Sequence, residues 1–211
     1  MRIWSLACLL AIASTAAVAQ GVNPPVAPNI PAPATQSSLY GGNSELFVGG
    51  SYQFAKATVA NAVAVSTSNV AGVQLGYRYH ASDYNAVEVR LAMASPTQLY
   101  GLSTIVKSRD IEFSLDYVFT IPTDGKIRPF FLGGGGFIDY SPTGSGNTPG
   151  ATSQKRLALN YGGGLDFTLS PHWGLRVEFR GLIYRLPDFD LIGISKWNHM
   201  PEPDIGLVWH F

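Results

Sequence analysis

The residues in this sequence best suited to chemistry are histidines that have hydroxyl and carboxylate groups close by in the chain. A hydrolytic centre needs a histidine, a nucleophile and an acidic residue together. His80, Ser82 and Asp83 are close neighbours, but their segment has the composition of a tight turn. A second set shares one polar segment near the C-terminus and matches no known motif: Asp190, Ser195, His199 and Glu202. Metal-ligand spacings and nucleotide fingerprints are also missing, so the sequence predicts no catalytic residues, no metal site and no cofactor.

Arginines and carboxylates form a larger and more regular set, because most of them alternate with apolar residues. Arginine is suited to buried, bidentate pairing with carboxylates, so we expect an ion-pair network inside the protein. Its predicted members are Arg78, Glu88, Arg90, Asp110, Glu112, Asp116, Asp139, Asp166, Arg176, Glu178, Arg180 and Asp204. Acids outnumber arginines, and a bare buried charge is costly. The surplus acids must therefore be protonated, hydrated or bonded to hydroxyls.

The elements that would position these charges are strands. The stretch DIEFSLDYVFTI at 110–121 places large apolar residues at every odd position and Asp110, Glu112 and Asp116 among the even ones. A period of two is typical of a strand, whose successive side chains leave on opposite faces. Comparable patterns predict eight strands, at 44–56, 70–80, 85–95, 109–121, 128–140, 156–169, 172–185 and 202–211.

The connections between these strands alternate in length. Short turns at 80–85, 122–127 and 170–171 follow the second, fourth and sixth strands, and long polar loops at 57–69, 95–108, 141–155 and 186–201 follow the others. An up-and-down meander places all short turns at one end and all long loops at the other, as in bacterial outer-membrane barrels. The predicted fold is all-β: an eight-stranded antiparallel up-and-down transmembrane β-barrel with long extracellular loops and short periplasmic turns.

Alternation alone also fits a soluble, lipocalin-like ligand-binding barrel with its apolar face inside. Three observations favour an apolar exterior. The polar face has arginine but no lysine within strands, and it carries many small residues, which leave room for arginines to cross a narrow lumen. Aromatic residues of the apolar face gather near the strand ends, as in membrane-interface belts. They are Tyr77, Tyr79, Tyr117, Phe119, Phe130, Phe167, Trp173, Trp209 and Phe211 near the turns, and Tyr52, Phe54, Tyr140 and Tyr184 near the loops.

The N-terminal region has features of export. Residues 1–19 combine Arg2, an apolar stretch and a small-residue cleavage site at Ala17–Ala19, which predicts a signal peptide cleaved near Ala19. Residues 20–43 are rich in proline, which predicts an extended periplasmic linker, and 44–211 would form the barrel. Charged residues make up 13% of the chain with a net charge of zero, so a nucleic-acid partner is not expected.

Three segments carry a resemblance to a known family: PFFLGGGGF at 129–137, NYGGGLDFTLSPHWGLRVEFR at 160–180 and the terminal DIGLVWHF. Over about 44–211 the chain resembles the small eight-stranded outer-membrane barrels, similar to the OmpA-type transmembrane domain. The resemblance implies that Trp209 and Phe211 in the last strand form the signal read by the barrel assembly machinery. Because some barrels of this family modify lipid A, it also raises an enzymatic alternative.

These observations predict an integral protein of the bacterial outer membrane with a structural, envelope-integrity or surface-interaction role. The ion-pair network would fill the lumen, so an open pore is not expected. The expected partners are outer-membrane lipid and lipopolysaccharide, and the protein is expected to be a monomer. The phosphates of lipopolysaccharide would meet basic residues near the long loops, namely Lys56, Lys107, Arg109, Lys155, Arg156, Arg185 and Lys196, set against Asp188, Asp190 and Glu202. An outer-leaflet lipid A-modifying enzyme and a soluble lipocalin-like barrel remain as alternatives.

Overall fold

The computed structural model describes residues 42–144, 147–191 and 193–211. The predicted signal peptide at 1–19 and all but two residues of the predicted linker at 20–43 lie outside this range. The described residues form eleven strands: β1 (Ser44–Gln53), β2 (Thr58–Ala60), β3 (Val63–Thr67), β4 (Val70–His80), β5 (Asn85–Ala94), β6 (Thr97–Tyr100), β7 (Thr104–Thr120), β8 (Ile127–Pro142), β9 (Gln154–Thr168), β10 (Trp173–Arg185) and β11 (Trp197–His210).

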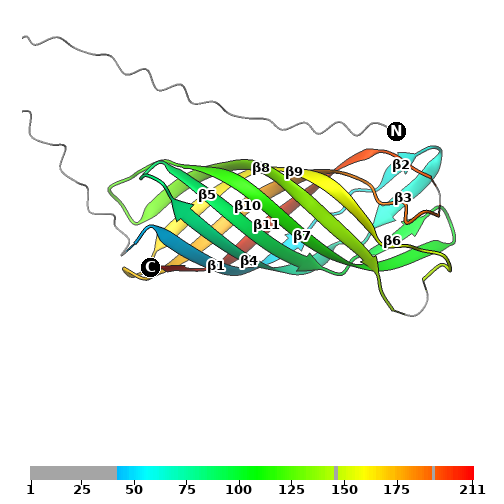
Figure 1. The fold of residues 1–211 in the computed structure, drawn as a ribbon, viewed down its shortest axis with the longest axis horizontal. Coiled ribbons are helices and arrows are strands. Elements are labelled where there is room, and N and C mark those ends of the chain that lie inside the picture. Colours follow the sequence, from blue (N-terminus) through cyan, green and yellow to red (C-terminus); the bar gives the residue numbers. More distant parts are fainter. Residues whose placement is uncertain (1–41, 145–146, 192) are drawn as a thin grey trace, which may run out of the picture. The chain divides into compact units, whose positions relative to one another are not determined.

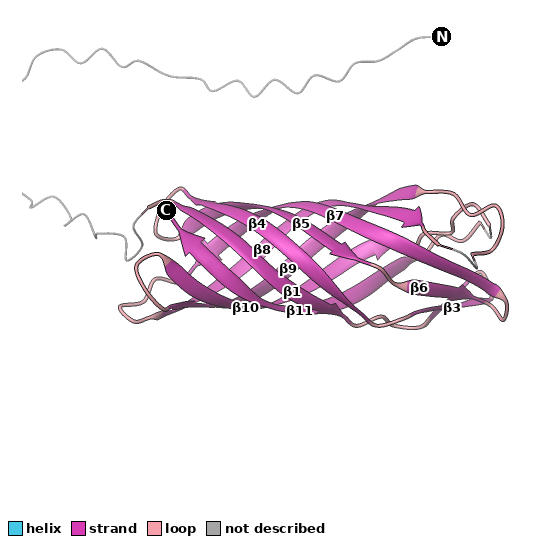
Figure 2. Cartoon of the chain, turned by 90° about the horizontal axis from the view of Figure 1, so that it is seen from below, coloured by secondary structure: helices cyan, strands magenta, loops and turns pink. Residues whose placement is uncertain are grey.

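Eight of these strands close into a barrel, which Figures 1 and 2 show from two directions. Each long strand pairs antiparallel with its two neighbours in the order β7-β5-β4-β1-β11-β10-β9-β8, and β8 pairs again with β7. The closing pair runs from Ser108 opposite Pro142 to Thr120 opposite Phe130. The eight-stranded antiparallel barrel is therefore confirmed. Closure leaves none of the eight long strands with a free edge facing lipid, where a backbone N–H or C=O group would find no hydrogen-bond partner.

Two of the predicted loops contain additional strands. Segment 57–69 forms the β2–β3 hairpin, and segment 95–108 contains β6 and the first residues of β7. β3 pairs with β6, and β6 pairs with β7 between Thr104 and Lys107, so these short strands extend the barrel wall at its loop end. The prediction missed them because they are only three to five residues long, so TVA, VAVST and TQLY contain too few alternating positions to identify a strand.

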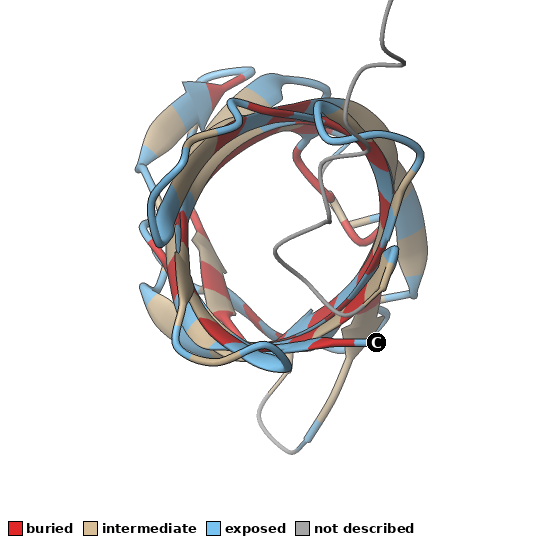
Figure 3. Ribbon diagram, turned by 90° about the vertical axis from the view of Figure 1, so that its left-hand side faces the viewer, coloured by how far each residue is buried: buried red, intermediate tan, exposed pale blue. Residues whose placement is uncertain are grey.

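The orientation of the wall agrees with the prediction. In β7, Asp110, Glu112 and Asp116 are buried, whereas Leu115 and Tyr117 are exposed on the outer wall. In Figure 3, which views the barrel from one end, buried and exposed residues alternate along the strands. Most of the predicted aromatic belt near the turns is also exposed, including Trp173 and Trp209. An apolar exterior and a charged interior are the reverse of a soluble calyx. Among the described residues, no helix is long and apolar enough to cross a membrane.

Strand β8 corrects the prediction in one respect, because its two faces are exchanged. Phe130 and Tyr140, assigned to the belt, are buried in the lumen, and Asp139, assigned to the network, lies on the outer wall. Tyr184 of β10 is also buried inside. In PFFLGGGGF both faces consist of apolar residues and glycine, so alternation carries no information there. The orientation is instead set by pairing with β7, where Asp116 lies opposite Gly134.

Candidate functional site

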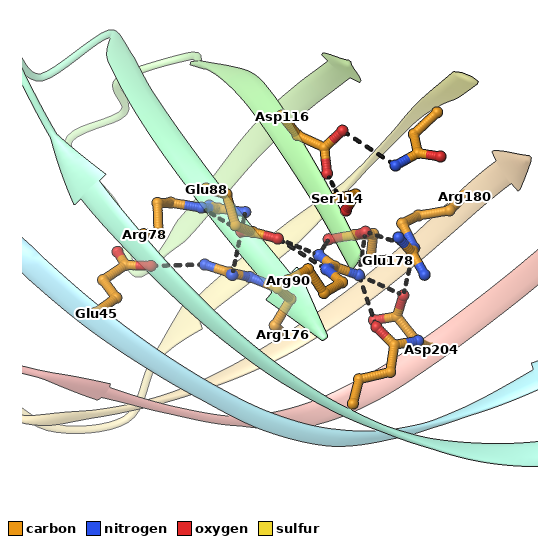
Figure 4. A network of polar contacts seen from close by, with 12 residues as sticks. Glu45, Arg78, Glu88, Arg90, Ser114, Asp116, Arg176, Glu178, Arg180 and Asp204 are labelled. Carbon is orange, nitrogen blue, oxygen red and sulfur yellow. Dashed lines mark hydrogen bonds and ion pairs between the residues drawn. The ribbon is translucent and has the colours of Figure 1, made fainter. Parts of the chain in front are cut away.

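The lumen contains a network of buried ion pairs, part of which is drawn in Figure 4. Its half nearer the short turns is centred on Arg176, whose guanidinium contacts Asp166 at 2.6 Å, Glu45 at 2.7 Å and Glu88 at 3.2 Å. Arg78 donates from Nε to Glu88 at 2.8 Å and pairs with Asp166 at 3.1 Å. These contacts join β1, β4, β5, β9 and β10 across the lumen.

The half of the network nearer the long loops is centred on Arg90 and Arg180. Arg90 reaches Glu88 at 2.5 Å, Glu178 at 2.9 Å and Asp204 at 3.3 Å, so it connects the two halves. Arg180 pairs with Glu112 at 2.9 Å and with Glu202 at 3.3 Å. The arginines of both halves are completely buried or nearly so. Charged pairs of this kind are costly to break, because removing one partner leaves the other buried and uncompensated.

Two phenylalanines lie between the guanidinium groups. Phe130 has Arg78 at 4.5 Å and Arg176 at 5.2 Å from its ring centre, and Phe47 has Arg90 and Arg176 at 5.5 Å each. Both rings are about 1% exposed. The negative face of an aromatic ring attracts a cation, so these rings add to the stabilisation of the arginines. Phe47 has the same parity as Glu45 in β1, which could have placed it in the lumen, whereas Phe130 lies in β8, where alternation carries no information.

The network differs from the predicted set at several positions. Asp110 and Asp116 point into the lumen but bond to neutral groups, Ser108 for the first and Ser114 and Asn160 for the second. Asp139 pairs with Lys155 on the outer wall at 3.4 Å. Two members were missing from the predicted network: Glu45, which also meets His80 at 2.6 Å, and Glu202.

Glu202, the first residue of the last predicted strand, was grouped with the polar segment before it, but it lies inside β11 and is completely buried. Pro201 and Pro203 flank it, and proline normally argues against a strand. The parity of the last strand could have identified Glu202, because it shares a face with Asp204 and His210.

Above the network, the loop end of the lumen is closed by an apolar cluster, here called the plug. It contains Ala60, Val65, Tyr100, Val106, Ile138, Tyr140, Ala158, Leu182, Tyr184, Leu186, Phe189, Ile194 and Met200. Phe189 comes from the segment after β10, has a φ of 51° and is fully buried. Asp188 beside it accepts hydrogen bonds from Gln154 at 2.7 Å and Arg156 at 3.0 Å, which fixes this segment to β9.

The candidate hydrolytic residues are not assembled. His80 contacts Glu45, while Ser82 accepts hydrogen bonds from the backbone of Tyr84 and Asn85 in the turn. His199 lies on the outer wall, where its ring stacks on that of Tyr161. Its Nε2 atom forms a hydrogen bond of 2.7 Å with the Tyr161 hydroxyl. Its proposed partners lie elsewhere, since Glu202 is in the lumen and Asp190 bonds to Thr152 and Gln154. Within 42–144, 147–191 and 193–211, no group of three acidic, His or Cys residues could hold a metal ion.

Comparison with known proteins agrees with this architecture. A family model described as "Outer membrane protein beta-barrel domain" matches residues 5–198. No curated protein matches the chain.

Three similar solved structures are small outer-membrane proteins. Neisserial surface protein A has a TM-score of 0.60 at 10% identity, covering 81% of this chain and 98% of its own. OprG from Pseudomonas aeruginosa has a TM-score of 0.53 at 13% identity, with 82% and 98% covered. Ail of Yersinia pestis, solved with the heparin analogue sucrose octasulfate, has a TM-score of 0.51 at 16% identity, with 80% and 97% covered. At these identities the likeness concerns the fold. The matched family model, the closed barrel and its apolar outer wall together show that the chain belongs to the outer membrane protein β-barrel family and is located in the bacterial outer membrane.

Proposed function

We propose that the protein is a non-conducting barrel with a structural role in the outer membrane, and that its loop end forms a folded platform at the cell surface. The observation that carries the proposal is the occlusion of the lumen. Arg90, Arg176 and Arg180 are completely buried among carboxylates, and the plug lies above them. An eight-stranded barrel has an interior just wide enough for side chains, so a lumen filled in this way leaves no continuous water path.

Conductance in planar lipid bilayers tests the absence of a pore. Purified protein is expected to insert without discrete current steps, whereas a porin added to the same bilayers provides the positive control. Reproducible steps from the wild-type protein would refute the proposal.

A role in envelope integrity is tested in a deletion strain, which is expected to leak periplasmic enzymes more than the complemented strain. A change in the lipid A mass spectrum of the deletion strain would instead favour an enzyme.

We further propose that exposed cations at the loop end contact the phosphates of lipopolysaccharide. Lys107 and Arg109 are exposed on β7 and Lys155 on β9, with β8 between the two strands on the outer wall. Charge-assisted hydrogen bonds to phosphate are among the stronger polar contacts. Adding lipopolysaccharide should raise the unfolding temperature of the wild-type protein but not of a variant with these three residues changed to Gln. Lys126→Gln, at the turn end, is the control and should keep the response. The lipopolysaccharide contact is rejected if the triple variant responds like the wild type.

The last strand and the oligomeric state complete the proposal. Trp209 and Phe211 are exposed on the outer wall of the last strand and its end, with ring centres 4.8 Å apart. We propose that the assembly machinery reads these two rings, so Phe211→Ala should slow assembly in cells while leaving the folded barrel stable.

Because the barrel closes on itself, we propose that it functions as a monomer, and sedimentation in detergent should give the mass of one chain.

A further inference from the structure

A small cavity lies inside the barrel, between the ion-pair network and the plug. Its volume is about 20 Å³, enough for one water-sized particle. Residues of both neighbouring regions line it, with Glu112 from the network and Tyr140, Tyr184 and Met200 from the plug. Much of the wall is polar, since Gln53, Gln98, Asp110, Thr67 and Ser68 also contribute to it. The cavity is therefore unlike an apolar void, which stays empty.

Two polar groups at this cavity have bonding capacity to spare. Asp110 is buried and accepts one hydrogen bond, from Ser108 at 2.6 Å. Tyr140 lies directly opposite Asp110 in the β7–β8 pairing and is only 3% exposed. In the part of the chain that the structure describes, its hydroxyl has no hydrogen-bond partner and Asp110 has no cationic one. A buried carboxylate and a buried phenol oxygen thus lie in the same cavity wall, and both can accept a further ligand.

The charge balance of the lumen shows which kind of ligand is missing. Among the described residues, nine buried carboxyl groups face four buried guanidiniums, an excess of five acidic groups (9 − 4). They are Glu45, Glu88, Asp110, Glu112, Asp116, Asp166, Glu178, Glu202 and Asp204 against Arg78, Arg90, Arg176 and Arg180. Glu112, the other acid at the cavity, is already paired with Arg180 at 2.9 Å. Asp110 therefore contributes the one uncompensated carboxylate in the cavity wall, and a bare charge there is costly.

We propose that this cavity binds a single small monovalent cation, such as sodium, with Asp110 as its charged ligand. The Tyr140 hydroxyl oxygen and the Gln53 amide oxygen complete a set of hard oxygen donors, since the Gln53 amide nitrogen is already donated to Glu202. One charge matches one unpaired carboxylate, and the volume excludes organic ammonium ions with several carbons. Zinc and copper favour imidazole or thiolate ligands, and no His or Cys of the described chain lines the cavity.

The test compares two chloride salts of equal ionic strength on the full-length barrel in a nonionic detergent. Sodium can enter the cavity, whereas choline is too large, and both screen surface charges equally. A ligand that binds only the folded state raises stability with the logarithm of its concentration above the dissociation constant. The unfolding temperature should therefore rise more with sodium chloride than with choline chloride. Asp110→Asn should abolish this difference, and Tyr140→Phe should reduce it.

Asp139→Asn is the matched control, because Asp139 is adjacent to Tyr140 but lies on the outer wall. It should keep the full sodium response. Equal responses to both salts in the wild-type protein would overturn the proposal. The cavity would then contain only water, or the Asp110 side chain would be protonated and bind no cation. A larger response to calcium chloride at equal ionic strength would overturn the monovalent assignment. If Asp110→Asn failed to fold, the salt comparison on the wild type and Tyr140→Phe would still decide.

Discussion

At the scale of single residues, Arg90 carries the strongest prediction. It pairs with three carboxylates from two halves of the network, so Arg90→Leu leaves Glu88, Glu178 and Asp204 short of a partner. Removing one partner of a buried ion pair costs about 3–5 kcal/mol. We expect a loss of this size in the free energy of unfolding, measured by urea titration in detergent. Arg109→Leu, on the exposed outer wall, should change it by about 0.5 kcal/mol or less. Equal midpoints for both variants would mean that the network does not stabilise the barrel.

The neighbouring pair Phe130 and Phe131 separates the two faces of β8. Phe130 is buried between Arg78 and Arg176, whereas Phe131 is 59% exposed on the outer wall. Phe130→Leu should lower the free energy of unfolding by about 2 kcal/mol, because desolvated cation–π contacts are lost. Phe131→Leu keeps an apolar side chain facing lipid and should have a much smaller effect. The opposite ranking in urea titrations would contradict the observed orientation of β8.

At the scale of elements, the four glycines of β8 are not equivalent. A Cβ atom on Gly136 would lie far inside contact distance of the Phe113 backbone in β7, whereas one on Gly133 would meet no atom closer than 3.9 Å. Gly136 therefore permits the close approach of the closing pair. We expect Gly136→Ala to destabilise the barrel by about 1–3 kcal/mol through overpacking and Gly133→Ala to leave it nearly unchanged. Thermal unfolding on gels measures both, and equal tolerance would contradict this role for Gly136.

Individual strands differ in how far the sequence predicts them. In β7 the charged and apolar faces are distinct, so both its position and its orientation follow from alternation. In β8 glycine occupies both faces, and only the pairing of Asp116 with Gly134 fixes the orientation. Pairings between distant segments, such as Arg176 with Glu45, depend on the stagger of the closed barrel, which no local pattern encodes. The types of residue that fill the lumen could therefore be predicted from the sequence, but the individual contacts between them could not.

At the scale of the whole molecule, charge and apolar packing divide the interior. The network joins the strands in the part of the lumen between the turn end and the plug. The plug joins the loop ends of β7 to β11 with the short strands β2, β3 and β6. Buried ion pairs fix geometry more than they add stability, because desolvation offsets much of their attraction. Apolar burial in the plug contributes stability more directly, at about 25 cal/mol per Å². The loop end should consequently be part of the folded barrel and not a mobile fringe.

This division predicts that the two ends of the barrel unfold together. Trp173 lies at the turn end and Trp197 at the loop end, and both are exposed on the outer wall. Two variants are compared: in each, Trp209 and one of these two residues are replaced, so that either Trp173 or Trp197 is the only tryptophan left in the barrel. They should give the same urea midpoint by fluorescence, since coincident probes indicate one cooperative transition. Phe189→Ala opens the plug and should cost about 3–5 kcal/mol locally. In that background the midpoint reported by Trp197 should fall below that of Trp173. If the variant that reports on Trp197 unfolded at a lower urea concentration even with Phe189 in place, the loop end would fold independently. The plug would then not couple the loop end to the membrane-spanning strands.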